Sequence, residues 1–218
     1  MEIAILIYPR FTALDAVGPY EVLGRLPGAK VTFVAERAEP QRTDTKQLAI
    51  VADATIEELP HPDIVLVPGG PGQSALMADG PVHEWLRTAD ATSTWTASVC
   101  TGALILAAAG LLDGKRATSN WQALDELRSL GAEVVPERVV FDGKFVTSAG
   151  VTAGIDMALS LAAHIAGEQV AQAIQLGLEY DPQPPFDAGS PEKAPAEVVE
   201  AVRAYSRFVE GAAPEHAA

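Results

Sequence analysis

Cys100 is the only cysteine of the 218-residue chain, and its place between a strand-like and a helix-like stretch is typical of a nucleophile. In TASVCTGALILAAAGLL, residues 96–112, an apolar run ends just before Cys100 and small residues follow from Thr101. This is the order of a G-x-S-x-G nucleophile elbow, with Cys100 in the place of the serine and Ser98 in that of the first glycine. Backbone N–H groups at the helix start favour the thiolate, so we predict a nucleophile with a lowered pKa. The alternative is a buried thiol that only fills space.

Asp15 is the candidate proton donor and acceptor for this nucleophile. It follows the first apolar run of the chain and opens a helical stretch in FTALDAVGPYEVL. In a parallel sheet this position lies at the same edge as Cys100, where a carboxyl group can exchange protons with a substrate. An aspartic acid beside a thiolate resists ionisation, because two negative charges in one pocket repel each other. The alternative is an N-cap aspartate, and the two roles are compatible.

A glycine-rich loop, PGGPG at residues 68–72, directly follows the third apolar run. Its backbone N–H groups, that of Gly70 among them, lie at the predicted edge of Cys100 and can hold developing negative charge. The alternative is a loop that needs glycine only for its backbone freedom. The stretch has neither the lysine of a P-loop nor the G-x-G-x-x-G order, so it does not indicate a phosphate or dinucleotide site.

The four histidines supply no clear general base and no metal site. His61 stands in a proline-rich connection, His83 at a predicted exposed helix start, His164 in a predicted packed helix, and His216 in the tail. They do not combine with carboxylates at the spacing of metal ligands. We therefore predict no metal site.

Composition restricts the class of protein and its partners. A formal net charge of −14 at pH 7 disfavours binding to nucleic acid or to anionic lipid, which are themselves negative. With 48% hydrophobic residues the chain can bury one sizeable core, and we predict a single domain over residues 1–211 with a fraying tail at 212–218. A single cysteine forms no internal disulfide, and the acidic start MEIAILIYPR is not a signal peptide, so a cytoplasmic protein is expected. No apolar run reaches the roughly 20 residues that span a bilayer.

Alternating strands and helices are expected to position these residues. Nearly continuous apolar runs at 3–8, 31–36, 63–68 and 94–99 predict strands covered on both faces. Helices are predicted at 15–26, 73–77, 81–91, 101–112, 152–165, 169–178 and 196–210. Residues 138–148 predict a hairpin with a type I′ turn at Asp142-Gly143, and the proline-rich stretch 180–195 predicts irregular structure. The sequence thus indicates an α/β fold with a doubly wound, mostly parallel sheet.

The PGG loop, the cysteine in SVCTGA and the acid in LDAVGP make the chain resemble the DJ-1/PfpI superfamily over nearly its whole length. AGLLDGKRATSNW, GVTAGIDMALSLAA and above all LEYDPQPPFDAGSP are similar to the isonitrile hydratase branch, which hydrates R–NC to an N-substituted formamide. This resemblance implies a flavodoxin-like fold, a homodimer, Cys100 as nucleophile, Asp15 as its acidic partner and Thr101 beside them. It also implies that no metal or organic cofactor is used.

Related amidase-like regulators of the AraC type share the CTG-A and AGLLDG-RAT elements, but this chain stops at Ala218 without a basic segment. The family often has histidine at Asn120, and glycine-rich residues in place of Ser148 and Ala149. These departures concern substrate range and loop mobility. From the residues alone, Ser119 or Asn120 caps a helix that begins at Trp121.

The predicted function is isonitrile hydration through a cysteine thioimidate. Cys100 attacks the terminal carbon, Asp15 handles protons, and Thr101 orients substrate or water. The predicted substrate-binding residues are Gly70, Pro71, Gly72, Trp121, Gly150 and Val151, of which Trp121 and Val151 are equally compatible with ordinary core. The alternatives are a glyoxalase-like enzyme and a ligand or redox sensor in which Cys100 is oxidised.

Overall fold

The computed structural model describes residues 1–206. Within them a seven-stranded sheet has the order β10-β11-β7-β6-β1-β2-β5, and all its neighbouring strands are parallel except β10 and β11. The strands are β1 (Glu2–Leu6), β2 (Lys30–Ala35), β5 (Ala54–Thr55), β6 (Ile64–Val67), β7 (Trp95–Val99), β10 (Val139–Asp142) and β11 (Phe145–Ser148). The predicted parallel sheet is confirmed.

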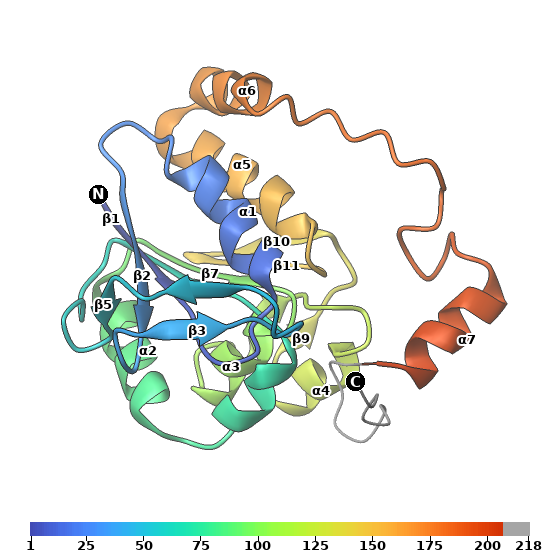
Figure 1. The fold of residues 1–218 in the computed structure, drawn as a ribbon, viewed down its shortest axis with the longest axis horizontal. Helices are drawn as coiled ribbons and strands as arrows, with labels where there is room; N and C mark the ends of the chain where they lie inside the picture. Colours follow the sequence, from blue (N-terminus) through green and yellow to red (C-terminus); the bar gives the residue numbers. More distant parts are fainter. Residues whose placement is uncertain (207–218) are drawn as a thin grey trace.

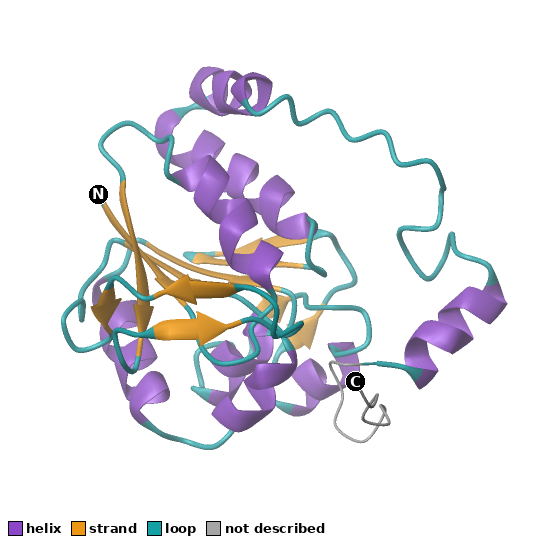
Figure 2. Cartoon of the chain, viewed as in Figure 1, coloured by secondary structure: helices purple, strands orange, loops and turns teal. Residues whose placement is uncertain are grey.

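Helices cover both faces of the sheet (Figures 1 and 2). One side carries α1 (Ala13–Leu23), α5 (Ala153–Ala166) and α6 (Glu168–Gly177), and the other carries α2 (Pro81–Thr92), α3 (Gly102–Ala108) and α4 (Leu124–Ser129). The remaining elements are the 3-10 helix η1 (Pro71–Leu76), α7 (Ala196–Ala204), the pair β3 (Pro40–Arg42) and β4 (Ala49–Val51), and the pair β8 (Arg116–Ala117) and β9 (Glu133–Val134). The α/β, doubly wound arrangement is therefore as predicted.

The central strands are buried because both of their faces are covered. Every residue of β6 is buried, and so are four of the five residues of β1 and of β7. Continuous apolar runs, rather than alternating ones, match this environment. The carboxyl ends of these three strands lead directly into the loops that carry the candidate site.

The predicted hairpin is present, but its turn lies one residue further along than expected. Asp142 pairs with Phe145, so the two loop residues are Gly143 and Lys144. Gly143 has a φ of 60°, whereas Lys144 is not among the residues with positive φ. A positive φ at the first loop position alone fits a type II′ turn, and the predicted type I′ turn at Asp142-Gly143 is wrong.

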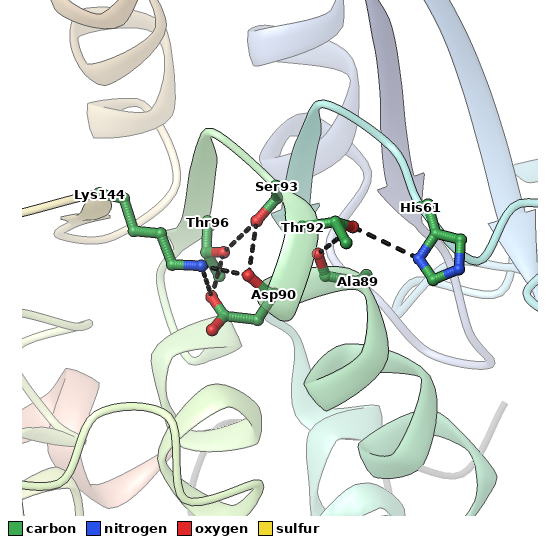
Figure 3. Close-up of polar contacts among 7 residues, drawn as sticks. All are labelled: His61, Ala89, Asp90, Thr92, Ser93, Thr96 and Lys144. Atoms are coloured by element: carbon green, nitrogen blue, oxygen red, sulfur yellow. Dashed lines mark hydrogen bonds and ion pairs between the residues drawn. The ribbon is translucent and has the colours of Figure 1, made fainter.

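Lys144, in the turn of this hairpin, bonds to the last turn of α2 near the amino end of β7 (Figure 3). Its ammonium group lies 3.1 Å from the Asp90 carboxylate and also donates to the Asp90 carbonyl. The Thr96 hydroxyl donates to the same carboxylate at 2.7 Å and lies 3.1 Å from the Ser93 hydroxyl. These contacts hold the amino end of β7, whereas Cys100 follows the carboxyl end of the same strand.

Several helix ends differ from the prediction. Helix α3 stops at Ala108 instead of residue 112, because Gly110 adopts a left-handed φ of 81° that ends the helix. Helix α7 begins at Ala196 as predicted, but it ends at Ala204 with its C-cap at Tyr205, so the predicted extension to residue 210 is wrong. The predicted domain end at 211 and the tail at 212–218 lie outside the described residues. Across residues 1–206, no helix combines the length and the apolar character needed to cross a membrane.

Candidate functional site

Cys100 occupies a strained turn between β7 and α3. Its φ of 56° is left-handed, which is uncommon for a residue other than glycine and typical of strained functional turns. Its backbone N–H donates to the carbonyls of Ser148 and Ala149, each at 3.1 Å, and its own carbonyl accepts the Ser119 hydroxyl at 2.8 Å. These bonds hold the turn in place, and the geometry of the predicted elbow is present.

The thiol of Cys100 is completely buried, and its environment exerts opposing effects. Burial raises its pKa above the ordinary value, and the nearby charge of Asp15 raises it further. The backbone N–H groups of Thr101 and Val151 and the side-chain amide of Asn120 act to lower the same pKa. The predicted net lowering is therefore wrong. The hydrogen-bond donors of the turn are present, but they lower the pKa of the thiol by less than burial raises it.

Asp15 is also fully buried and lies within electrostatic reach of the thiol. It is the third residue of α1, and its Oδ2 accepts the backbone N–H of Gly69 at 3.0 Å. The N-cap position belongs to Thr12, so the N-cap alternative for Asp15 is wrong. A carboxyl group held by the loop after β6 and close to the thiol suits proton exchange better than helix capping.

Thr101 fastens the glycine-rich loop to the elbow. Its hydroxyl accepts the Gly70 N–H at 2.9 Å, while Gly72 N–H donates to the Arg10 carbonyl at 3.2 Å and Pro71 begins η1. The Gly70 N–H that we predicted to hold developing charge is thus already engaged, and that expectation is wrong for this geometry. The loop instead positions Asp15 and Cys100: Gly69 bonds to the Asp15 carboxylate, and Gly70 bonds to the residue that follows Cys100.

Tyr8 also helps to hold the glycine-rich loop beside Asp15 and Cys100, and the sequence analysis did not predict this role. Its hydroxyl donates to the Pro68 carbonyl at 2.8 Å, and the ring is buried. Burial, followed by the charges of Asp15 and Cys100, raises the pKa of this phenol well above its ordinary value, so the hydroxyl remains a neutral donor. In the sequence Tyr8 is merely the end of an apolar run. The available signal was that a buried tyrosine hydroxyl needs a partner.

A pocket of about 410 Å³ is lined by Asn120 and Val151, two of the groups that act to lower the pKa of Cys100, whereas Cys100 and Asp15 do not line it. Three predicted substrate-binding residues line it, namely Trp121, Gly150 and Val151. The predicted Gly70, Pro71 and Gly72 do not line it. One wall comes from the late irregular segment, through Gly189, Ser190, Pro191 and Glu192. The pocket mixes apolar and polar walls, which suits a small organic ligand.

Asn120 is a lining residue of this pocket that the sequence analysis did not assign to the site. Its Oδ1 accepts the backbone N–H of Gln122 at 3.0 Å, which orients the amide. Its Nδ2 lies 2.9 Å from the position that a Cβ at residue 150 would take, so Gly150 leaves room for the amide. No helix begins at Trp121, because α4 starts at Leu124, and the predicted capping roles of Ser119 and Asn120 are wrong.

The histidines of the described chain lie away from the site. His83 is 1% exposed, so its predicted exposed position is wrong, and its Nδ1 lies 3.4 Å from a carboxylate oxygen of Asp79. His61 contacts the Thr92 hydroxyl, whereas His164 is exposed and stacks on Phe141. His216 lies outside the described residues. Between residues 1 and 206 no group of three or more His, Cys, Asp or Glu side chains is placed to hold a metal ion.

The mostly parallel sheet, the cysteine turn after β7 and the acid at the start of α1 define a class of α/β proteins built around a buried thiol. The sequence profile of the DJ-1/PfpI family matches residues 1–164, and the chain belongs to this family. It is 45% identical to the isonitrile hydratase of Pseudomonas putida over 203 residues, which cover 93% of this chain and 89% of that protein.

Two other similarities extend this finding. The chain is 37% identical over 127 residues to the HTH-type transcriptional regulator CdhR of Pseudomonas aeruginosa, covering 57% of this chain and 37% of the regulator. The crystal structure of a THiJ/PfpI family protein from Pseudomonas syringae superposes with a TM-score of 0.91 at 41% identity, covering 95% of this chain and 86% of that one. The fold is thus shared over nearly the whole chain.

Proposed function

We propose that this protein is a cofactor-independent isonitrile hydratase, which converts R–NC and water to an N-substituted formamide. The observation that carries the proposal is the buried pair of Cys100 and Asp15 at the elbow. It occurs in a chain that is 45% identical to an isonitrile hydratase over most of both lengths.

In the first step the Cys100 sulphur forms a bond to the terminal carbon of the isonitrile. A single proton is shared between Cys100 and Asp15, because two negative charges in one buried site repel each other. The attacking form is the thiolate with Asp15 protonated. As the S–C bond forms, one bond of the carbon–nitrogen triple bond breaks, and the proton of Asp15 goes to the carbon. The product is a neutral thioimidate on Cys100 with Asp15 ionised.

In the second step Asp15 acts as a base on water. The hydroxide part adds to the thioimidate carbon, and the proton passes through Asp15 to the nitrogen, which leaves a neutral tetrahedral adduct. Asp15 then removes the hydroxyl proton, the carbonyl forms and the carbon–sulphur bond breaks. The formamide leaves, with Cys100 as the thiolate and Asp15 again protonated, so atoms and charge balance over the cycle.

The pocket beside Cys100 is the proposed site for the substituent R. Trp121 and the neighbouring Leu124 give it an apolar wall, and Pro191 adds a further apolar contact from the late segment. A volume of about 410 Å³ falls within the range of small-molecule sites. We therefore expect alkyl and aryl isonitriles to be substrates.

The direct test is to incubate the purified protein with several alkyl and aryl isonitriles and to follow the formamides by mass spectrometry. Cys100→Ser is expected to abolish turnover while the fold remains nearly intact, because a hydroxyl is far weaker as a nucleophile near neutral pH. Near wild-type turnover in that variant would refute the covalent mechanism. Loss of stability with preserved activity would assign Cys100 to packing.

The same fold is compatible with two other functions, and the substrate assay distinguishes both from isonitrile hydration. A glyoxalase-like enzyme would turn over small dicarbonyls instead of isonitriles. A ligand or redox sensor would turn over neither, and would lose its response without any change in catalysis when Cys100 is replaced. The similarity to the regulator CdhR over 127 residues is the reason to include the sensor hypothesis in the experiment.

We propose in addition that the protein is a cytoplasmic homodimer. Helix α7 has no buried residue and exposes Val198 and Val202 one turn apart, and the C-cap residue Tyr205 directly after the helix is also exposed. Phe186 in the preceding segment is 78% exposed. An exposed apolar stripe of this kind favours burial against a second copy. Sedimentation analysis tests the assembly.

A further inference from the structure

We infer that Arg203, near the end of α7, determines which substituents the pocket accepts, because it holds the Trp121 ring in the pocket wall. The inference rests on the proposed function in one respect, namely that this pocket receives the substituent R. Arg203 does not line the pocket itself, so it is a positioning residue that acts through Trp121.

The first argument is the contact between these two side chains. The guanidinium carbon of Arg203 lies 5.3 Å from the centroid of the Trp121 ring, within the distance of a cation–π interaction. Tryptophan is the best ring for such a contact, and the planar guanidinium also stacks on it. Trp121 is only partly buried and stands in an irregular stretch between β8 and α4. Arg203 therefore restricts the positions that this ring can take.

The second argument is that the end of α7 is attached to the same stretch of chain by hydrogen bonds. Gln122 donates its Nε2 to the Val202 carbonyl at 3.3 Å, and the Ser206 hydroxyl donates to Gln122 Oε1. The residue next to Trp121 thus binds α7 on both sides of Arg203. In Figure 1, α7 lies apart from the helices that cover the sheet, so these contacts at its end matter for its placement.

The third argument is the place of these residues relative to the part of the chain that the family shares. The DJ-1/PfpI profile ends at residue 164, whereas the similarity to the Pseudomonas putida protein covers 203 residues and so continues beyond that point. The later part supplies residues 189–192 to one wall of the pocket and fixes another wall through Arg203. Among proteins that share a fold, loops and added segments set which ligand is accepted. Selectivity is therefore expected to depend on this later part.

The chemistry of the wall defines which isonitriles are sensitive to Arg203. Trp121, Leu124 and Pro191 give the pocket its apolar lining. A cyclohexyl group buries apolar area against such a wall and loses part of it when the Trp121 ring moves, whereas a methyl group has little area to lose. Arg203 therefore favours bulky apolar isonitriles over small ones.

The test compares wild type, Arg203→Met and Arg203→Lys with cyclohexyl isonitrile and methyl isonitrile. Methionine keeps an unbranched side chain but removes the charge and the planar group, whereas lysine keeps a cation. We expect the ratio of kcat/KM for the bulky over the small isonitrile to fall about three- to fivefold in Arg203→Met, through KM, and by less in Arg203→Lys. Arg128→Met is the matched control, because Arg128 is also exposed but pairs with Asp125.

A second measurement uses the fluorescence of Trp121 and needs no turnover. The emission of Trp121 is the difference between each protein and the same protein carrying Trp121→Phe. In Arg203→Met we expect acrylamide to quench this emission more strongly, because the ring loses the group that covers it. The dissociation constant of N-cyclohexylformamide, the proposed product, is expected to rise about three- to fivefold in the same variant.

Unchanged quenching in Arg203→Met would overturn the inference, and so would an unchanged affinity for N-cyclohexylformamide or an unchanged selectivity ratio. Equal changes in Arg128→Met would overturn it as well, because the effect would then belong to any exposed arginine. Absence of turnover of both isonitriles by the wild type refutes the proposed function instead. In that case the affinity for N-cyclohexylformamide decides the role of Arg203 alone.

Discussion

The hydroxyl of Thr101 accepts a hydrogen bond of 2.9 Å from the backbone N–H of Gly70, and this contact joins the elbow to the loop after β6. The preceding residue of that loop, Gly69, donates its N–H to Asp15. Thr101, next to the proposed nucleophile, and Asp15, the proposed proton carrier, are therefore both hydrogen-bonded to the loop after β6. A change at Thr101 is expected to reach Asp15 through the loop.

Thr101→Val is expected to reduce turnover at least about tenfold and to destabilise the fold by about 1–3 kcal/mol, because the buried Gly70 N–H loses its acceptor. Thr101→Ser is expected to restore most of both, since it keeps the hydroxyl. The control is Thr147→Val, which removes a similar buried acceptor from the Thr118 N–H at 2.9 Å. Kinetics and thermal unfolding of the three variants check the prediction. Equal losses of activity in Thr101→Val and Thr147→Val would show that only stability is affected.

Asp15→Asn is expected to lower turnover by at least about a hundredfold, because the amide has no proton to transfer. The same change removes the charge that raises the pKa of Cys100, so alkylation of the thiol is expected to shift to lower pH. Asp15→Glu is also expected to lose rate, because the extra methylene moves the carboxyl in a tight site. A rate within a few fold of wild type and an unchanged alkylation profile would leave Asp15 with only a structural role.

The sheet and the elbow were predictable because their signals are local. Continuous apolar runs marked β1, β6 and β7, and the small residues after Cys100 marked the elbow between strand and helix. A Cβ at Gly102 would collide with the Val67 carbonyl, which explains glycine at that position. The neighbourhood of Cys100 and Asp15 followed from their places at the carboxyl ends of strands, whereas their catalytic roles stay predictions.

The less predictable parts depend on tertiary contacts. The pKa of Cys100 was predicted in the wrong direction, because the sequence shows the donors of an elbow but not how completely a thiol is buried. The acceptor of the Tyr8 hydroxyl lies 60 residues away, at Pro68, so no local pattern reveals this bond. Asn120 lines the pocket because the chain turns there, and the helix that the sequence predicted from Trp121 does not begin until Leu124.

The protein is expected to lose stability at alkaline pH, partly through Cys100. The pKa of this thiol is raised in the folded state, so its contribution is fully present below the pKa of the unfolded chain, about 8.5. Above that pH the unfolded chain releases the proton while the folded chain keeps it, and stability falls until the folded pKa is reached. The raised pKa of Tyr8 adds a second loss that begins at about pH 10.

Urea unfolding between about pH 7.5 and about pH 9.5 measures the first of these losses. Cys100→Ser has no titrating thiol and is expected to lose less stability than wild type over this interval. Parallel curves for the two proteins would contradict the prediction.

The late segment between α6 and α7 is expected to shape the substrate pocket and to take part in the dimer. In this segment Tyr180 donates its hydroxyl to Asp156 at 3.0 Å, and Asp156 also pairs with Arg138 at the pocket. Phe186 is exposed in the isolated chain, so its ring is free to meet a second copy. The two aromatic residues thus have different expected roles, which separate variants distinguish.

Tyr180→Phe is expected to raise KM several-fold for bulky isonitriles and to leave KM for small ones nearly unchanged, because it releases the anchor of the segment whose residues 189–192 close one wall of the pocket. Phe186→Ala is expected to weaken the dimer, because burial of an aromatic ring is worth about 1.5–3 kcal/mol. Leu48→Ala, which truncates another exposed apolar side chain, is the control for a nonspecific effect on the surface. Sedimentation, kinetics and thermal unfolding are measured on each variant and on the Tyr180→Ala, Phe186→Ala double variant. If the double variant matches wild type in all three, the segment only connects two helices.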